Sequence, residues 1–510
     1  MAGRIHAQVI VVGGGPVGML VAAELAAQGV ETVVLESEAA ISERPKATTL
    51  HARAVQCLAR RGYFFAPETR STGRAATMPF HFGGIPGLSI TAPEKEPDPI
   101  LKSPQAELER FFGERARSNG ARVLRQHRVT DMTQDQDGVR VTAESPQGTR
   151  TFTGAYVVGA DGARSTVREA AGIASDVNSP TMSAMMGLVR IPDGQTVPVG
   201  WHRMSGGWLI AKNGPDGRTL IHTLVCGDES SHRHLPLTLA ELSKEASWIA
   251  GRDITMTDPR WLSRFSDFTR LARTYRAGRF LLAGDAAHVH FPIGGQGLST
   301  GVLDALNLSW KLALVVRGAA ADGLLDTYGP ERRPAAQRVI DNTRAQATLM
   351  RPGIELDALR ALFGGLLESG GGNDFLGGMI SAQDTVLPES PRFGSPREGT
   401  FLDNVELTTD EGPSDVIRLL GEGGEPLLLL FGDEAGRHAE TARDRSRSLR
   451  VVRCLPTRDM PCSALLVRPD GYVAWASDGG GPLADALATF FGTDAGPGPV
   501  TGPVPESAPT

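Results

Sequence analysis

The densest run of potentially reactive side chains lies at residues 284–300, GDAAHVHFPIGGQGLST. It combines one carboxylate, two histidines at alternate positions, a proline and four glycines, and it leads directly into an apolar helical pattern. Glycines let backbone amides approach a ligand closely, and a following helix offers its N-terminal N–H groups. An acid, a glycine loop and a helix start together indicate a ligand that is held largely by backbone.

A second glycine run lies near the N-terminus, within AQVIVVGGGPVGMLVAAELAAQGVETVVLE. The pattern predicts a buried strand, a glycine turn, a helix and a second strand that ends at Glu36. Gly13, Gly15 and Gly18 have the G-x-G-x-x-G spacing that allows a tight turn and close approach of a pyrophosphate. A carboxylate at Glu36 suits a ribose hydroxyl and would repel a 2′-phosphate, which favours FAD or NAD over NADP. The alternative is an ordinary glycine turn in an α/β sheet.

The rest of the chain predicts further units. TFTGAYVVGADGARSTVREAAG indicates a buried strand, an Asp161-Gly162 turn and a helix start, and thus a second loop that faces a ligand. Residues 176–275 contain several strand-like segments and one amphipathic helix, which predicts a separate α+β domain. Residues 383–400 have the composition of a linker, and apolar strands of a small α/β domain follow.

Composition limits the possible partners. The 510-residue chain is 41% apolar with a net charge of -6, which argues against a nucleic-acid surface or a polybasic membrane patch. Four cysteines without close pairing favour a reducing cytoplasm. We find no signal peptide and no apolar run of about 20 residues, so we expect a cytoplasmic protein outside the membrane. His288 and His290 could form half a metal site, but no third ligand has suitable spacing, so we expect no metal.

Three motifs now occur in order: GGGPVG, GADGARSTVR and GDAAHVHFPIGGQGLST. Together they resemble the glycine, DG and GD motifs of the class A flavoprotein aromatic monooxygenases. The ending VRPDGYVAWAS looks like the thioredoxin-like domain of the aromatic polyketide hydroxylase branch. The resemblance implies an α/β fold: a Rossmann-like FAD-binding domain of the GR2 type, an inserted α+β substrate domain and a C-terminal thioredoxin-like domain. The expected bounds are 1–175 and 276–385 for FAD binding, 176–275 for substrate, 386–495 for the thioredoxin-like domain and 496–510 for a disordered tail.

The resemblance also implies a reaction. FAD would be the bound cofactor, NADPH a transient reductant and dioxygen a co-substrate, with a flavin hydroperoxide hydroxylating a polycyclic aromatic of the polyketide type, as in antibiotic biosynthesis. NADPH would dock at a groove, because the chain has no second G-x-G-x-x-G. Two alternatives stay open: Baeyer-Villiger oxygenation of a polyketide ketone by the same flavin peroxide, and a non-catalytic flavin-binding ligand carrier or redox sensor. The protein would act as a monomer or homodimer.

The site residues follow from the same resemblance. Catalytic positions are Arg53, Pro292 and Gly295, and Trp208 is a candidate substrate contact; the alternatives are a surface charge for Arg53 and a core position for Trp208. Lys46 stands where relatives often have arginine, and Gln105 could equally be a helix N-terminal residue. Asp161 could serve FAD, NADPH or its own loop. The implied cofactor contacts are Gly13, Gly15, Pro16, Gly18, Glu36, Lys46, Arg53, Gln105, Asp161, Gly162, Asp285, Gly295, Gln296, Gly297 and Leu298.

Overall fold

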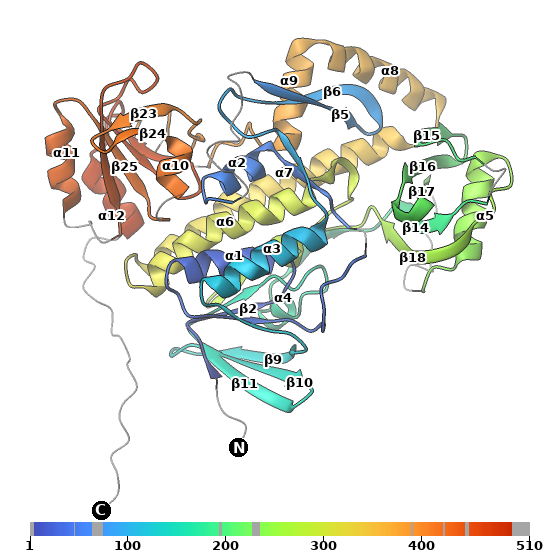
Figure 1. The fold of residues 1–510 in the computed structure, drawn as a ribbon, viewed down its shortest axis with the longest axis horizontal. Helices are drawn as coiled ribbons and strands as arrows, with labels where there is room; N and C mark the ends of the chain where they lie inside the picture. The colour runs from blue at the N-terminus through green and yellow to red at the C-terminus, as the bar shows by residue number, and fades with distance from the viewer. Residues whose placement is uncertain are drawn as a thin grey trace, which may run out of the picture.

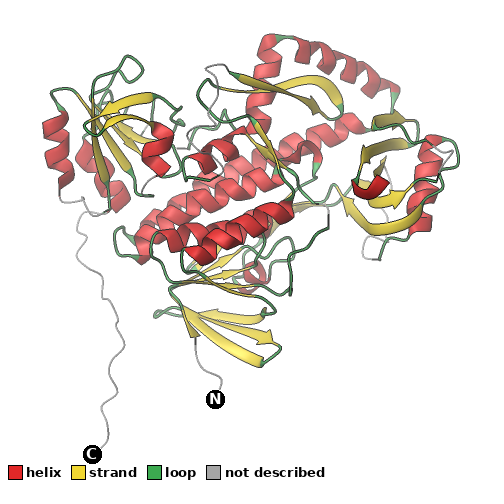
Figure 2. Cartoon of the chain, viewed as in Figure 1, coloured by secondary structure: helices red, strands yellow, loops and turns green. Residues whose placement is uncertain are grey.

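The computed structural model places a parallel sheet at the centre of the molecule (Figure 1). It describes residues 5–44, 46–63, 75–192, 196–226, 235–388, 390, 392–421, 424–443 and 448–491. The expected tail at 496–510 lies outside these residues. Helices gather on one side of the central sheet, and separate sheets lie at the two ends of the molecule (Figure 2).

The central sheet has the strand order β20-β21-β12-β2-β3-β8. The strands are β2 (Val9–Val12), β3 (Thr32–Leu35), β8 (Arg122–Leu124), β12 (Tyr156–Gly159), β20 (Arg276–Ala277) and β21 (Phe280–Leu282). β2, β3 and β12 are buried throughout, as the continuous apolar runs predicted. Helix α1 (Pro16–Ala27) joins β2 to β3 and packs between α3 (Gln105–Ser118) and α6 (Gly297–Val316). The predicted βαβ unit is confirmed.

A four-stranded sheet lies beside the central one, in the order β1-β11-β10-β9. Its strands are β1 (Ile5–His6), β9 (Arg128–Gln134), β10 (Val139–Ser145) and β11 (Gly148–Gly154). β9 and β10 pair antiparallel around a turn that contains Asp137 and Gly138. Short connecting elements complete this half: β13 (Ser175–Asn178), β19 (Thr269–Ala272), β22 (His288–Val289), α4 (Thr166–Ala170) and the 3-10 turns η3 (Gly284–Ala286), η4 (Ile293–Gly295) and η5 (Asp322–Thr327).

A five-stranded antiparallel sheet forms a second body, in the order β15-β16-β17-β14-β18. Its elements are β14 (Met182–Arg190), β15 (Gly200–Met204), β16 (Gly207–Asn213), β17 (Thr219–Cys226), β18 (Thr257–Ser266) and α5 (Leu239–Ala250). A capping box at Thr238 and Glu241 begins α5, and Gly251, at a φ of 65°, ends it. Leu209, Ala211 and Ile221 pack against α5, so α5 covers one face of the sheet.

A hairpin and four helices connect the two bodies. They are β5 (Ala76–Phe82), β6 (Ile85–Ala92), α2 (Ala52–Ala59), α7 (Tyr328–Met350), α8 (Ile354–Glu368) and α9 (Gly370–Ser381). β4 (Thr49–His51) and β7 (Ile100–Lys102) form a separate antiparallel pair. No helix of the described residues combines the length and the apolar character needed to cross a bilayer.

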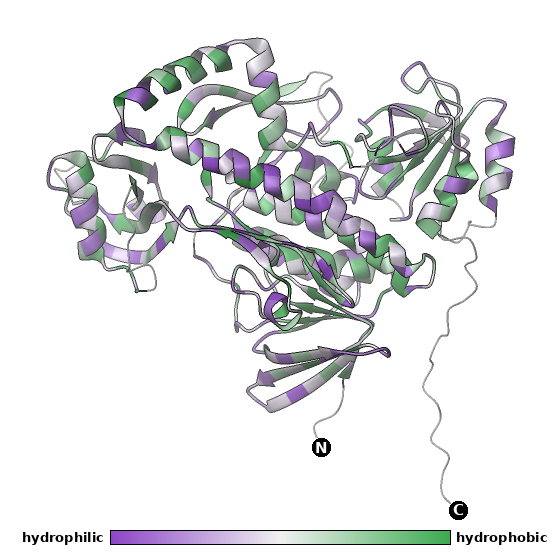
Figure 3. Ribbon diagram, turned by 180° about the vertical axis from the view of Figure 1, so that it is seen from behind, coloured by the Kyte–Doolittle hydropathy of each residue, from purple (hydrophilic) through white to green (hydrophobic). Residues whose placement is uncertain are grey.

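The C-terminal body is a six-stranded sheet in the order β24-β23-β26-β25-β27-β28, in which the neighbouring strands β25, β27 and β28 are apolar (Figure 3). Its elements are β23 (Glu406–Thr409), β24 (Gly412–Asp415), β25 (Leu427–Phe431), β26 (Arg450–Cys454), β27 (Ala464–Val467), β28 (Val473–Ala476), α10 (Val416–Gly421), α11 (Ala435–Ala442) and α12 (Leu483–Phe491). Trp310 and Leu314 of α6 share a core cluster with Leu428 and Leu430 of this sheet. The C-terminal body is therefore docked on α6.

Candidate active site

The N-terminal glycine turn is built by contacts that exclude larger side chains. Gly13 has a φ of 104°, and a Cβ there would lie 2.8 Å from the Cα of Asp161. A Cβ on Gly18 would collide with the carbonyl oxygen of Gly13, so this glycine lets α1 pack on the turn. A Cβ on Gly15 would meet nothing within 4 Å. Open space therefore remains in front of the α1 N-terminus, where a phosphate binds favourably.

The carboxylate of Glu36 is held at the end of β3. Its Oε2 accepts a hydrogen bond from the Gly14 backbone N–H at 2.5 Å, and its Oε1 accepts one from the Glu38 N–H at 2.7 Å. Burial of the side chain is only partial. Oε1 also accepts from the Ser37 hydroxyl at 3.3 Å, whereas Oε2 retains a lone pair, so Glu36 can still accept a ribose hydroxyl as its position predicted.

The DG loop is tied to its own helix and to the GD loop. Asp161 accepts from the Ser165 hydroxyl at 2.5 Å and from the Val167 N–H at 3.2 Å, so its carboxylate serves the loop itself. Burial raises the pKa of Asp161 despite these bonds. Arg168 donates to the carbonyl of Ala286 at 2.9 Å and so links the DG loop to the GD loop. Gly162, at a φ of 77°, borders open space.

The Asp285 carboxylate is available to accept hydrogen bonds. Its side chain is exposed and makes no hydrogen bond to any described residue. Burial of the surrounding site nevertheless raises its pKa, while the charges of His288 and Lys46 oppose that rise. The structure thus brings Lys46 and Asp285 within electrostatic range of each other. A carboxylate with free acceptor positions fits the cofactor contact that the resemblance implies for Asp285.

The two histidines of the GD segment have structural partners. Nε2 of His288 lies 2.6 Å from Oδ2 of Asp304 on α6, and Nδ1 of His290 lies 2.9 Å from the carbonyl oxygen of Phe291. Burial lowers the pKa of His290 to about 4. In the part of the chain that the structure describes, no three His, Cys, Asp or Glu side chains gather as metal ligands would.

The loop after Pro292 is shaped by two glycines at positive φ, Gly294 at 76° and Gly295 at 63°. His51 holds this loop through a 2.8 Å hydrogen bond from Nε2 to the Gly294 carbonyl. Burial lowers the pKa of His51 to about 4, so the imidazole is neutral at pH 7. The sequence motifs did not point to His51, although it stands two residues before the predicted site residue Arg53. Pro292 itself is exposed, and Gln296, Gly297 and Leu298 begin α6.

Arg53 and Gln105 stand in different surroundings. The Arg53 guanidinium is buried, donates to the carbonyls of Ala382 and Gln383 and lies 3.7 Å from the centre of the Phe401 ring. Arg53 is therefore buried, and the alternative of a surface charge is wrong. Its catalytic role stays a prediction. Gln105 begins α3, and its backbone N–H bonds to the Ala47 carbonyl, next to Lys46.

The environment of Trp208 favours the core alternative. The residue is 2% exposed, and its indole N–H donates to the Met350 carbonyl at 2.6 Å. It lies in one hydrophobic cluster with Phe291 and Ile293, which belong to the GD segment at 284–300. A side chain so enclosed offers no surface to a substrate, because its ring packs on protein and its polar atom is satisfied. Trp201, which packs edge-on at 6.1 Å, remains partly exposed.

These observations fit FAD. The cofactor needs open space at a glycine turn, a carboxylate beside the ribose, a carboxylate beside the ribitol and a loop with unpartnered polar atoms at the ring. Gly15 borders the open space, Glu36 is the carboxylate at the ribose position, and Asp285 is the carboxylate at the ribitol position. For the fourth, Nδ1 of His51 and Nε2 of Gln296 are buried without a partner among the described residues.

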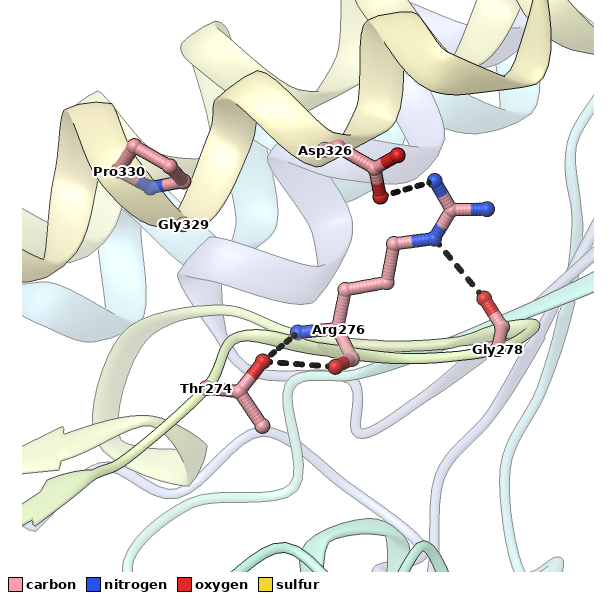
Figure 4. A pocket seen from close by; sticks show the side chains of 6 residues that line it. All are labelled: Thr274, Arg276, Gly278, Asp326, Gly329 and Pro330. Atoms are coloured by element: carbon pink, nitrogen blue, oxygen red, sulfur yellow. Dashed lines mark hydrogen bonds and ion pairs between the residues drawn. The ribbon is translucent and has the colours of Figure 1, made fainter.

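A separate hollow lies between β20 and the start of α7 and is lined by none of the predicted site residues (Figure 4). Arg276 extends across it, and its guanidinium bonds to the Gly278 carbonyl at 3.0 Å and to Asp326 at 2.8 Å. A further bond to Asp322 completes the charge balance of Arg276. This hollow is therefore a satisfied surface ion-pair network.

Comparison with known proteins identifies the class. Residues 6–343 match the family model described as FAD binding domain, and residues 395–494 match the one described as Aromatic-ring hydroxylase, C-terminal. The chain therefore belongs to the family of FAD-dependent aromatic-ring monooxygenases, and the resemblance found in the sequence is confirmed.

Three relatives show the range within this family. Dialkyldecalin synthase from Streptomyces rugosporus is 39% identical, with 95% of this chain and 98% of that protein covered. The 12-dehydrotetracycline 5-monooxygenase/anhydrotetracycline 6-monooxygenase from Streptomyces rimosus subsp. rimosus is 36% identical, with 96% and 99% covered. The crystal structure of CabE, an aromatic hydroxylase from angucycline biosynthesis, matches with a TM-score of 0.85 at 34% identity and with 95% and 99% covered.

Proposed function

We propose that the protein is an FAD-dependent monooxygenase that uses NADPH and dioxygen to hydroxylate a polycyclic aromatic substrate of the polyketide type. The observation that carries this proposal is Asp285, an unpartnered carboxylate in a GD loop that Arg168 joins to the DG loop. Relatives that act on anhydrotetracycline support the substrate class. Dioxygen and the aromatic compound are the proposed partners, and the cytoplasm is the proposed location, with a monomer or homodimer as the working form.

The residues divide the work of such a reaction. Bound FAD supplies acceptance of hydride from NADPH and activation of dioxygen. We assign the turn at Gly13–Gly18 to the pyrophosphate, Glu36 to the ribose and Asp285 to the ribitol. The loop at 294–298 would contact the ring with backbone groups, and the positive N-terminal end of α6 would favour negative charge there. Phe291 and Ile293 pack on the five-stranded sheet, so water is excluded from that side of the loop.

NADPH would dock transiently on this scaffold. The residues described here contain one glycine turn of the dinucleotide type, and FAD occupies it in this proposal. We assign FAD binding to 1–175 and 276–385 and substrate binding to 176–275. The position of the five-stranded sheet at one end of the molecule supports that division (Figure 1).

We assign a thioredoxin-like fold without redox chemistry to 386–495. A mixed sheet in which β25 is parallel to β26 and antiparallel to β27, flanked by α10, α11 and α12, supports this assignment. Cys454 and Cys462 are both free. Burial raises the pKa of the Cys454 thiol to about 11, so little reactive thiolate is present at pH 7.

A second candidate function is a cyclisation without oxygen transfer. It rests on the 39% identity to a dialkyldecalin synthase over nearly the whole chain. In that case the flavin would have a structural role and no redox role, and the product would be an isomer of the substrate. The two candidates differ in oxygen and NADPH consumption.

Labelled dioxygen separates these reactions. The holoenzyme is incubated with NADPH, ¹⁸O₂ and a panel of polycyclic phenols, each first screened for stimulation of flavin reduction. Hydroxylation puts one labelled atom into a ring hydroxyl and one into water, whereas Baeyer-Villiger oxygenation puts the label into an ester or lactone. An isomeric product without label and without NADPH oxidation would favour the cyclase. Flavin that is never reduced, with any member of the panel, would favour a carrier or sensor.

A further inference from the structure

Helix α2 presents one face to the C-terminal body, beside which it lies in Figure 1. Arg53, Cys57 and Arg60 stand at positions i, i+4 and i+7, which share one side of a helix. The Arg53 and Arg60 guanidinium carbons lie 3.7 and 4.3 Å from the centre of the Phe401 ring. The Cys57 thiol donates to the Asp470 carbonyl at 3.4 Å. Phe401 precedes β23, and Asp470 lies between β27 and β28, so the C-terminal body contacts α2 at each of these positions.

The two segments that meet α2 are bonded to each other. Phe401 pairs with Tyr472 in an antiparallel bridge, and the two rings lie edge-to-face with centroids 5.3 Å apart. The Leu402 N–H donates to the Gly471 carbonyl at 2.9 Å. A Cβ on Gly471 would lie 2.6 Å from the Phe401 ring and 2.9 Å from Cδ of Arg60. The ring is therefore closely packed between this turn and α2, and a smaller side chain would leave a cavity there.

The Phe401 ring also faces positive charge. Arg60 is paired with the Glu96 carboxylate at 2.6 Å, and both side chains are completely buried. The hydrogen bonds of Arg53 go to the Gln56 side chain and to two backbone carbonyls, which are neutral acceptors. The face of an aromatic ring attracts a guanidinium, and the attraction is stronger for a desolvated cation. Replacing Phe401 by an aliphatic residue should therefore loosen Arg53 by more than the loss of volume alone would.

The N-terminal end of α2 holds the loop that precedes α6. His51 is the residue before α2, and its Nε2 lies 2.8 Å from the Gly294 carbonyl oxygen. The His51 backbone N–H donates to the Ser299 hydroxyl, in the first turn of α6, at 3.0 Å. A helix of 8 residues is about 12 Å long and moves as one unit, because its backbone is hydrogen-bonded from turn to turn. A shift of α2 at Phe401 therefore moves His51 against the loop.

We propose that the C-terminal body positions the flavin ring through α2, with Phe401 as the positioning residue. Contact of Phe401 with Arg53 and Arg60 fixes the place of α2. His51, at the other end, then fixes the loop at 294–298. The inference rests on the proposed function, because the assignment of FAD to this site puts the flavin ring at that loop. It gives the C-terminal body a role in cofactor binding that needs no redox cysteines.

Measurements on bound FAD in the full chain test the proposal. Phe401→Leu removes the ring and keeps an apolar side chain. The FAD dissociation constant, from titration of apoprotein, should rise about three- to tenfold, because the hydrogen bond to the Gly294 carbonyl is misaligned. At saturating FAD, the visible circular dichroism of the bound flavin should also change. Loss of stability alone does not alter that signal in protein that is folded and saturated.

Phe431→Leu is the matched control. Phe431 is 3% exposed on β25 and packs in the core of the same body, in a cluster that contains no residue of α2. The same substitution there should also lower the free energy of unfolding, since it leaves a cavity. Both flavin measurements should stay as in wild type.

A double-mutant cycle tests the route through His51. Phe401→Leu and His51→Ala should raise the FAD dissociation constant non-additively, because each substitution weakens the same hold on the loop. In the double variant, Phe401→Leu should add less than about half of its separate effect on binding free energy. Phe401→Leu and Asp285→Ala should be additive, because Asp285 is assigned to the ribitol and not to the ring.

Flavin measurements in Phe401→Leu that match wild type would overturn the inference, as would equal changes in Phe431→Leu or strict additivity with His51→Ala. Phe401→Met, whose flexible side chain fills irregular gaps, replaces Phe401→Leu if that variant does not fold. Failure of the FAD assignment is distinguishable: Asp285→Ala and His51→Ala would then both keep full FAD affinity. If both lose affinity and Phe401→Leu does not, the positioning role alone is rejected.

Discussion

Nε2 of His288 lies 2.6 Å from Oδ2 of Asp304, and both side chains are almost completely buried. The same carboxylate accepts from Nε of Arg332 at 2.8 Å and from the Gly284 N–H at 3.1 Å. Asp304 therefore holds the GD loop to α6 and α7 at once. His288, which could have been half of a metal site, therefore helps to hold the GD loop in place.

Asp304→Asn should destabilise the protein strongly. Burial raises the pKa of Asp304, but His288 and Arg332 lower it by more, so the carboxylate is ionised and balances a buried guanidinium. Removing one member of a buried pair costs about 3–5 kcal/mol, because the other charge is left uncompensated. Urea unfolding of the apoprotein measures this loss. A free energy of unfolding within about 1 kcal/mol of wild type would contradict the role.

Asp285→Ala should separate cofactor affinity from stability. Asp285 has no hydrogen bond to described protein, so the apoprotein should keep its free energy of unfolding. FAD binding should weaken by about 1–3 kcal/mol, because an acceptor for the ribitol is lost. Titration of apoprotein with FAD, followed by flavin fluorescence, gives the affinity. Asp131→Ala, at an exposed position of β9, controls for the change in net charge; full FAD affinity in Asp285→Ala would refute the assignment.

His51 should make the apoprotein acid-sensitive. Its pKa is lowered to about 4 chiefly by burial, against an ordinary value of 6.5, so the unfolded chain binds a proton that the folded chain does not. This contribution to stability is complete above pH 6.5 and is lost as the pH falls toward 4, at about 1.4 kcal/mol per unit.

His51→Gln keeps a donor for the Gly294 carbonyl and removes the titration. The slope of unfolding free energy against pH between 6.5 and 4 should therefore decrease by about one proton in this variant. Urea midpoints at several pH values give both slopes. Identical slopes for wild type and His51→Gln would exclude His51 as the group responsible.

Arg468 should anchor the C-terminal body to α7. Its guanidinium donates to both oxygens of Glu331, at 2.9 and 2.7 Å, and to Asp470 at 2.6 Å. Arg468→Met should destabilise by about 3–5 kcal/mol and accelerate proteolysis near 383–400, because Glu331 keeps only Lys311 and Asn307 as partners.

Adding Glu331→Gln should recover part of that loss, since the uncompensated charge is then removed. Arg437→Met is the control, because Arg437 and Glu434 form an exposed pair worth less than about 1 kcal/mol. Strict additivity of Arg468→Met and Glu331→Gln would show that the two charges do not interact.

Local periodicity was sufficient for the elements that bind a dinucleotide. Apolar runs and glycine spacing predicted β2, α1 and β3, and Glu36 stands at the end of β3 as expected. These features depend on contacts within about 30 residues, where strand length, helix period and turn chemistry carry the information.

Side-chain roles between distant segments were decided by tertiary structure. Arg53 matched a family position, yet its guanidinium reaches residues 382 and 383 and the ring of Phe401. His51 and Gly294 are separated by 243 positions, and no local pattern relates them.

The sequence by itself therefore determined the kind of cofactor site, because glycine conformation and strand-helix periodicity are local properties of the chain. It also determined the order of the three motifs around that site. Only the tertiary structure decided which buried charges are paired, because the partner of His288 or Glu331 depends on packing between helices and sheets that are remote in the chain.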